Sequence, residues 1–112
     1  MKLFILSLVT VIALVLTLHA APDIRKFTGI ITDSMCVTGD HSAMKMGPTD
    51  AECTIACVSA HGAVYVLYDG KEAWTLSDQT TPEKFAGKKV TVSGTQDAKT
   101  KTIKVESISL AK

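Results

Sequence analysis

The feature that most constrains this chain is an uninterrupted apolar run near its N-terminus, Leu3–Leu18, which contains no charged residue. Lys2 precedes the run, and two alanines follow it just before Pro22, an order that is typical of a secretory signal peptide. The run is shorter than the roughly 20 apolar residues of a membrane-spanning helix. We therefore expect residues 1–21 to be a signal peptide, with an uncleaved N-terminal anchor as the alternative, and the mature protein to be periplasmic or secreted.

Removal of this segment leaves about 90 residues, enough for one small domain, which we expect over residues 22–112. Without Lys2, eleven Lys and Arg side chains balance eleven Asp and Glu side chains. A nucleic-acid binder needs a basic surplus to neutralise phosphates, so we do not expect nucleic acid as a partner. The positive mean hydropathy of the whole chain comes from the signal segment. We therefore expect no stable membrane association after cleavage.

Segments rich in β-branched residues and bounded by turn-forming residues predict a mainly β fold with five strands. The expected strands are residues 26–32, the two arms of a hairpin over 63–77, 88–95 and 100–110. Five strands with helical insertions suit a partly open barrel of the oligonucleotide/oligosaccharide-binding (OB) type, and an open α+β sheet is the alternative. The last two strands are expected to supply apolar side chains to the interior, with a bulge near Ser107: Val90, Val92, Ile103, Val105 and Ile108.

Within the hairpin, the dipeptide Asp69-Gly70 predicts a two-residue type I′ turn. That register would place Tyr65 opposite Trp74 on one face of the hairpin. Because the chain contains few aromatic residues, we expect Tyr65 and Trp74 to build the interior. Together with Tyr68, they are also the side chains that could stack on a sugar or base if this were a ligand-binding OB domain.

Two helices are expected between the strands, the first in the insertion after the first strand and a short one before the fourth. Thr49 and Glu52 match the S/T-x-x-E capping box, and Gly62 is placed to end this first helix in the left-handed conformation. The short helix is expected to have Thr81 as its N-cap and Pro82 as its first residue.

Four segments, FTGIITDSMC, ECTIACV, YVLYDG and FAGKKVTVSGTQDAKTKTIKVESI, together resemble a group of small exported bacterial proteins with an OB-like fold and mostly unassigned function. The resemblance covers nearly the whole mature chain. It implies that Cys36, His41, Cys53 and Cys57 match the recurring Cys-His-Cys-Cys pattern of that group. It supports the fold and implies no particular activity.

The same four residues form a candidate metal site on chemical grounds. Cys53 and Cys57 lie one turn apart on the predicted helix, so two sulfur atoms can reach one ion. If the preceding loop folds over the helix, Cys36 and His41 complete a Cys₃His set, which has the ligands of a tetrahedral zinc site. The spacing C-x₄-H-x₁₁-C-x₃-C matches no standard zinc finger or zinc ribbon.

Copper is the rival ion, because thiolate and thioether ligands favour Cu(I). The loop contains three methionines, Met35, Met44 and Met46. Methionines also fill irregular gaps in a protein interior, and for each of them that role is the more common one. The identity of the metal therefore stays open between zinc and copper.

A disulfide is the alternative to a metal, because an oxidising compartment favours cysteine pairing. A bond from Cys36 to either Cys53 or Cys57 would close a loop of about 17 to 21 residues and stabilise the domain by about 3 kcal/mol. Cys53 and Cys57 are poorly placed to pair with each other, since a disulfide needs Cβ atoms about 3.8 Å apart. The odd number of cysteines and the presence of His41 favour the metal.

Other polar residues near these segments have simpler roles. His61 is expected at the C-terminus of the helix, where the helix dipole stabilises an imidazole, so we do not predict it as a ligand. Asp33 and Asp40 flank the loop and are expected to be surface turn residues. A Cys36–His41 nucleophile pair lacks an orienting third group, so we expect binding rather than catalysis.

The sequence thus predicts an exported, metal-binding OB-like domain that holds structural zinc, or carries or sequesters copper. The alternative is a disulfide-stabilised OB-like module that binds a glycan or a protein partner without metal. The sequence specifies no protein partner.

Overall fold

The computed structural model describes residues 23–43 and 45–112 of the 112-residue chain. The predicted signal peptide, residues 1–21, lies outside the described residues, as does Met44. Across the described ranges, no helix combines the length and the apolar character needed to span a membrane.

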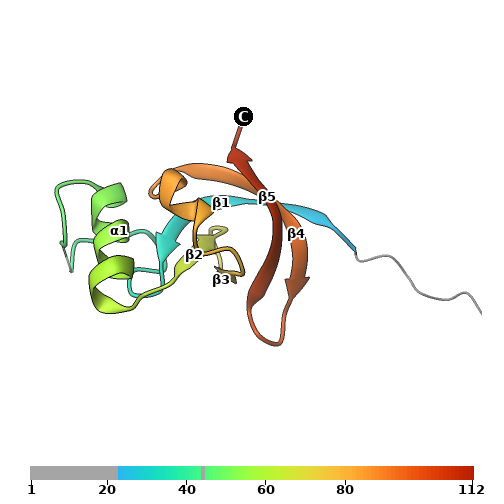
Figure 1. The fold of residues 1–112 in the computed structure, drawn as a ribbon, viewed down its shortest axis with the longest axis horizontal. Coiled ribbons are helices and arrows are strands. Elements are labelled where there is room, and N and C mark those ends of the chain that lie inside the picture. Colours follow the sequence, from blue (N-terminus) through green and yellow to red (C-terminus); the bar gives the residue numbers. More distant parts are fainter. Residues whose placement is uncertain (1–22, 44) are drawn as a thin grey trace, which may run out of the picture.

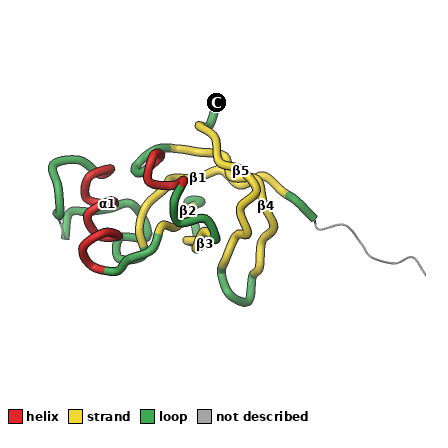
Figure 2. The backbone as a smooth tube through the Cα atoms, in the orientation of Figure 1, coloured by secondary structure: helices red, strands yellow, loops and turns green. Residues whose placement is uncertain are grey.

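The described chain contains five strands, one α-helix and one short 3-10 helix (Figures 1 and 2). In order, they are β1 (Arg25–Asp33), α1 (Asp50–His61), β2 (Tyr65–Tyr68), β3 (Ala73–Leu76), η2 (Thr81–Phe85), β4 (Lys89–Asp97) and β5 (Thr102–Leu110). The predictions of a mainly β fold, of a helix in the insertion after the first strand and of a short helix before the fourth are confirmed. Figure 1 shows α1 at one end of the molecule, beside the strands.

The five strands form one sheet that closes in a ring in the order β1-β2-β3-β5-β4. All neighbours are antiparallel except β3 and β5, which are parallel over a short contact. β1 closes the ring, because its residues 25–30 pair with β4 and its residues 30–33 pair with β2. Gly29 lies at this switch, where a Cβ atom would overlap the backbone carbonyl oxygen of Tyr68. A glycine is therefore needed for the strand to cross between its partners.

The core lies inside the ring and is built from alternating strand residues. Its buried members are Ile31, Tyr65, Leu67, Trp74, Leu76, Val90, Val92 and Ile103. The predicted inward positions on β4 and β5 are confirmed, with Val105 and Ile108 packed against this core as partly buried side chains. The register between β4 and β5 shifts at Ser93/Gly94, opposite Ser107 and Val105, so the irregularity lies where a bulge was expected.

The predicted turn of the β2–β3 hairpin is wrong. Leu67 pairs with Trp74, and the connection is the four residues 69–72 instead of two. The Asp69 carboxylate accepts hydrogen bonds from the backbone N–H groups of residues 71 and 72, and the Asp69 N–H donates to the Glu72 carbonyl. These bonds stabilise a longer loop, and they shift the register so that Tyr65 does not face Trp74. Both aromatic residues are nevertheless in the core, as expected.

The caps of the first helix are as predicted. The Thr49 hydroxyl accepts a hydrogen bond from the Glu52 N–H, and Gly62 ends α1 with a φ of 71°. The short helix begins one residue earlier than expected, because Thr80 and not Thr81 is its N-cap. The Asp78 carboxylate accepts hydrogen bonds from the N–H groups of both threonines, which supplies the cap that neither hydroxyl provides.

Candidate metal centre

The centre is built on the turn that follows β1. Asp33 is the last residue of the strand, and its side chain lies on the same face as the core residue Ile31. Its Oδ1 atom accepts hydrogen bonds from the N–H groups of Met35 (2.9 Å) and Cys36 (3.0 Å). A further bond from the Gly39 N–H to the Cys36 carbonyl continues the turn. This turn holds the side chain of Cys36 next to that of Asp33 beneath α1.

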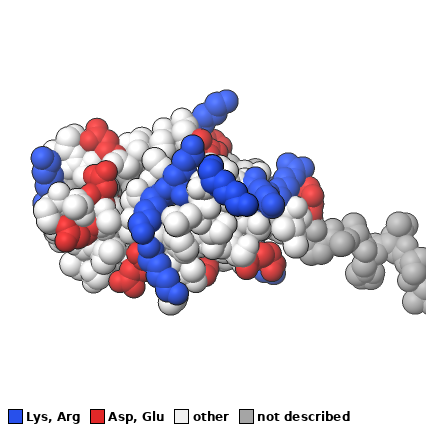
Figure 3. Space-filling model, turned by 90° about the horizontal axis from the view of Figure 1, so that it is seen from above, with Lys and Arg blue, Asp and Glu red and all other residues white. Residues whose placement is uncertain are grey.

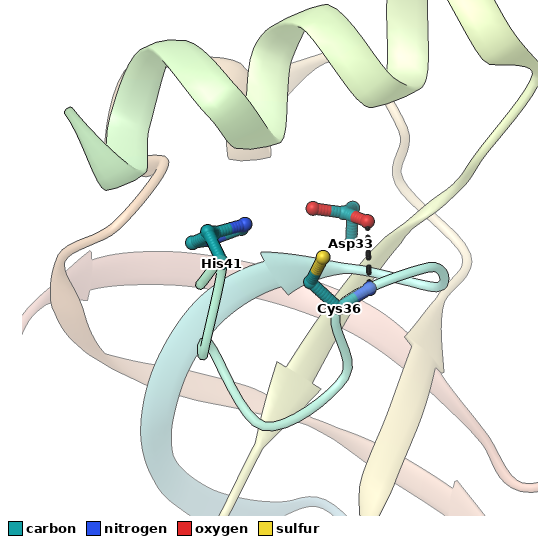
Figure 4. Close-up of side chains that lie close together, drawn as sticks. All are labelled: Asp33, Cys36 and His41. Atoms are coloured by element: carbon teal, nitrogen blue, oxygen red, sulfur yellow. Dashed lines mark hydrogen bonds between the residues drawn. The ribbon is translucent and has the colours of Figure 1, made fainter. Parts of the chain in front are cut away.

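His41 completes a group of three possible metal ligands. A carboxylate oxygen of Asp33, the sulfur of Cys36 and a ring nitrogen of His41 all lie within 4.8 Å of one another. The exposed fractions of the three residues are 0%, 9% and 7%. In Figure 4 the Cys36 sulfur and the His41 ring both point toward the Asp33 carboxylate, in the space below α1. The loop therefore lies beneath the helix, which is the arrangement that the metal hypothesis requires.

Two polar atoms of this group have no hydrogen-bond partner among the described residues. They are Oδ2 of Asp33 and Nδ1 of His41, and both are buried. The other ring nitrogen of His41, Nε2, lies 3.4 Å from the Thr54 hydroxyl on α1. Buried polar side-chain atoms are nearly always paired in native proteins, so two in one cluster need a cause.

The two remaining predicted ligands, Cys53 and Cys57, are buried on the face of α1 above the cluster. The Met46 N–H donates a hydrogen bond of 3.3 Å to the sulfur of Cys53. The charges that Cys53 and Cys36 take up on ionisation raise the pKa of Cys57, so the three thiols lie close enough to interact. None of the three cysteines is in a disulfide bond. Cys36 and His41 are thus grouped with Asp33, while Cys53 and Cys57 lie outside the 4.8 Å group and adjoin it.

The surroundings of the Cys36 and Cys57 thiols favour their neutral forms. Burial, followed by the charges of Asp33, Cys53 and Cys36, raises the pKa of Cys57 to about 11. Burial and then the Asp33 charge also raise the pKa of Cys36. The pKa of Tyr65 is raised by burial and by the Glu83 and Asp33 carboxylates. Asp33 forms no ion pair within the described ranges. Within the cluster, its carboxylate lies beside the Cys36 thiol and the His41 imidazole.

The prediction that Asp33 is a surface turn residue is wrong, because the residue is completely buried. It does form a turn, but with only one of its two carboxylate oxygens. A signal for its burial was present in the sequence, since position 33 continues the inward alternation of residues 29 and 31. Asp40, by contrast, is exposed, and hydrogen bonds from the backbone and side chain of Ser42 lower its pKa.

The other candidate side chains lie at the surface. Met35 and Met46 are 45% and 37% exposed, so neither fills a gap in the core. Met44 lies outside the described residues. His61 lies exposed in the last turn of α1, the position expected from the helix dipole.

A groove of about 530 Å³ leads from the surface to the centre. It runs between the 39–49 loop and the start of α1, and His41 and Cys53 form part of its wall. Asp40 and Asp50 also line it, together with Lys45. Figure 3 shows both acidic and basic side chains at the end of the molecule that α1 forms, and a band of Lys and Arg side chains farther along the same face. The groove thus reaches two of the predicted ligands, His41 and Cys53.

Residues 59–111 match the model of a family described as "Protein of unknown function (DUF5818)". No curated protein and no solved structure matches the chain. The matched part runs from the end of α1 through β5, so all four predicted ligands and Asp33 precede it. The match fits the expected likeness to small proteins of unassigned function and does not bear on the Cys-His-Cys-Cys pattern. Over its second half, the chain is similar to a family whose function is unknown.

Proposed function

We propose that this protein is an exported metal-binding protein that holds one transition-metal ion beneath α1, as structural zinc or as copper that it carries or sequesters. The ligands are drawn from Cys36, His41, Cys53 and Cys57. The observation that supports this proposal most is the buried cluster under α1, in which Asp33 Oδ2 and His41 Nδ1 lack hydrogen-bond partners among the described residues.

The physical reason is the cost of burying polar and charged groups. An ionised carboxylate taken out of water loses on the order of several kcal/mol of solvation, and the two backbone hydrogen bonds to Oδ1 of Asp33 leave its second oxygen uncompensated in the described part of the chain. A cation bound by the Cys36 thiol and the His41 imidazole beside that carboxylate offsets the loss, and thiolate and imidazole are both common zinc ligands. The adjoining thiols of Cys53 and Cys57 then provide sulfur for a full tetrahedral shell.

We further propose that the ring of strands is an OB-like barrel. The strand order and the single parallel contact between β3 and β5 support this assignment, as does the small size of the ring. An experimental structure in which β3 and β5 were not neighbours would contradict it.

Export is the part of the proposal that the first 21 residues support, through their charge and apolar pattern. Mass spectrometry of the protein recovered from the periplasm or medium should give a mature N-terminus near residue 21 or 22. A protein that retains residue 1 and sediments with membranes would instead be anchored.

The metal proposal is tested by purifying the protein without chelators and measuring metal content beside a thiol titration. We expect about one zinc or copper ion per chain, and three reactive thiols once the ion is removed and the protein is unfolded. His41→Ala should lower the metal content strongly. The matched control is His61→Ala, which changes an exposed histidine at the end of α1. This variant should keep the metal content of the wild-type protein. Absence of metal together with a single reactive thiol would support the disulfide instead.

No observation favours the glycan-binding alternative. Trp74 is only 4% exposed and contributes to the core, so its ring is not available for stacking. The ammonium group of Lys101 also lies 5.0 Å from the centre of that ring. Tyr68 is the one hairpin aromatic that is partly exposed.

A further inference from the structure

The geometry points to Asp33 as a direct metal ligand, whose carboxylate makes the site selective for a dication, zinc, over Cu(I). This inference rests on the proposed function, because it assumes that an ion binds beneath α1. It adds a ligand that the Cys-His-Cys-Cys pattern does not contain, and it decides between the two ions that the pattern leaves open.

The first observation that supports this inference is that the two oxygens of the Asp33 carboxylate differ in their hydrogen bonds. Oδ1 accepts two backbone hydrogen bonds and fixes the turn to Cys36. Oδ2 is buried and has no partner in the described ranges. An aspartate that served only the turn would be expected to leave its second oxygen in water, as the exposed Asp40 and Asp97 can. The second oxygen of Asp33 is instead enclosed with the Cys36 and His41 donors (Figure 4).

The second support is the distribution of charge around this carboxylate. The groups placed within 4.8 Å of an Asp33 carboxylate oxygen are the sulfur of Cys36 and a ring nitrogen of His41. No Lys or Arg in the described part of the chain forms an ion pair with it. The attraction between a carboxylate and an ion doubles when the ionic charge increases from +1 to +2. The buried carboxylate therefore favours a dication.

The third support is the type of donor atoms. Cu(I) prefers thiolate and thioether ligands, whereas zinc accepts thiolate, imidazole and carboxylate together. The group contains one oxygen, one nitrogen and one sulfur donor. Of the loop methionines, the two that the structure describes, Met35 and Met46, are exposed and are not enclosed with this group.

The test is Asp33→Asn, which keeps an oxygen for the turn and removes the charge. The matched control is Asp97→Asn, which changes an exposed aspartate that also accepts backbone hydrogen bonds in a turn, away from the centre. Zn²⁺ affinity is measured by competition with a chromophoric chelator, and Cu(I) affinity by competition with a Cu(I)-specific chelator under anaerobic, reducing conditions. We expect Asp33→Asn to weaken Zn²⁺ binding at least about tenfold. It should change Cu(I) binding by less than about threefold, and Asp97→Asn should change neither affinity by more than that.

Two results would overturn the inference while leaving the proposed function intact. One is unchanged Zn²⁺ affinity in folded Asp33→Asn, and the other is an equal loss of Zn²⁺ and Cu(I) binding. If the wild-type protein bound neither ion, the proposed function itself would fail, which is a distinct outcome.

A second measurement on the wild-type protein covers the case in which Asp33→Asn does not fold. Infrared difference spectra between the zinc-loaded and metal-free protein, with ¹³C-labelled aspartate, should show a shifted carboxylate stretching band. The shift should be absent when Cu(I) replaces zinc. A zinc-loaded protein without a shifted aspartate band would contradict the role of Asp33.

Discussion

At the end of β1, the side chain of Asp33 has two separate tasks. One oxygen closes the turn that brings Cys36 under α1, and the other has no hydrogen-bond partner in the part of the chain that the structure describes. A substitution that removes the whole side chain would therefore disturb the fold and the site together. An isosteric change such as Asp33→Asn separates the two tasks, which is why it is the informative variant.

The thiol of Cys57 predicts a pH dependence for the metal-free, reduced protein. Burial raises its pKa in the folded protein from an ordinary 9.0 to about 11, whereas in the unfolded chain the thiol ionises near the ordinary value. Between these values the unfolded state binds fewer protons, so the free energy of unfolding decreases as the pH rises. The contribution of Cys57 to the free energy of unfolding should be constant below about pH 9 and should decrease as the pH rises toward 11.

Thermal unfolding of the reduced apoprotein between pH 7 and pH 11 measures this effect. Cys57→Ala removes the ionisable group and should give a flatter profile than wild type. Identical profiles for the two proteins would show that the thiol is not buried as the structure describes.

Gly29 predicts a steric effect at the point where β1 changes partners. An alanine there would overlap the Tyr68 carbonyl, so Gly29→Ala should destabilise the protein by about 2 kcal/mol. Equilibrium unfolding in urea gives this value. Thr28→Ala, an exposed change on the same strand, is the control and should remain within about 0.5 kcal/mol of wild type. Equal stability of Gly29→Ala and wild type would mean that the strands do not approach so closely.

At the residue scale, the sequence predicted the position of apolar core side chains correctly. It did not predict the burial of Asp33, because that depends on what surrounds the residue in the fold. The inward positions of Val90 and Ile103 follow from simple alternation. Asp33 lies on an equally inward position, but its side chain is also a good turn former. Composition alone could not show that one residue fills both roles.

At the scale of elements, α1 is the part of the site with the most local support. The Thr49 cap satisfies a free N–H of the first turn, so Thr49→Ala should lower the free energy of unfolding by about 1 kcal/mol. Ser59→Ala, at an exposed position of the same helix, should stay within about 0.5 kcal/mol of wild type. Urea unfolding with circular dichroism measures both variants. An unaffected Thr49→Ala would mean that the capping bond is not formed in solution.

The contrast between α1 and the β2–β3 hairpin shows which elements the sequence determines. A helix cap depends on residues three apart, and Thr49 and Glu52 were sufficient to place it. The hairpin register depends on how Asp69 distributes its hydrogen bonds over the next three residues. The Asp-Gly signal is compatible with both the short and the long loop, and the pairing of Leu67 with Trp74 requires the long one.

At the scale of the whole molecule, the loop and α1 form an insertion beside the closed ring (Figure 1). The packing of α1 on the sheet is mainly on β1. The bound ion would therefore be a main link between the loop and the helix. Metal removal should increase amide hydrogen exchange over residues 34–61 and leave the β4–β5 hairpin unchanged.

Hydrogen-exchange mass spectrometry of the loaded and metal-free protein checks this prediction. The β4–β5 peptides serve as an internal control, because they lie away from the site. Equal exchange of residues 34–61 in the two forms would mean that the ion does not stabilise the insertion.

The number of strands, their order along the chain and a ring-like sheet were predictable, but the strand neighbours within the ring were not. Local patterns define each strand, whereas the neighbours of β1 and the contact between β3 and β5 join residues far apart in the sequence. The same limit applies to the centre. Cys53 and Cys57 are related by helical spacing, while the placement of Cys36 and His41 depends on the path of a loop.

The most direct test of metal binding beneath α1 is X-ray absorption spectroscopy at the zinc edge of the wild-type protein loaded with one equivalent of Zn²⁺. We expect a mixed first shell, with sulfur at about 2.3 Å and nitrogen or oxygen at about 2.0–2.1 Å. A shell of nitrogen and oxygen alone, a shell of sulfur alone, or a failure to retain the ion would contradict a centre that combines Cys36 with His41.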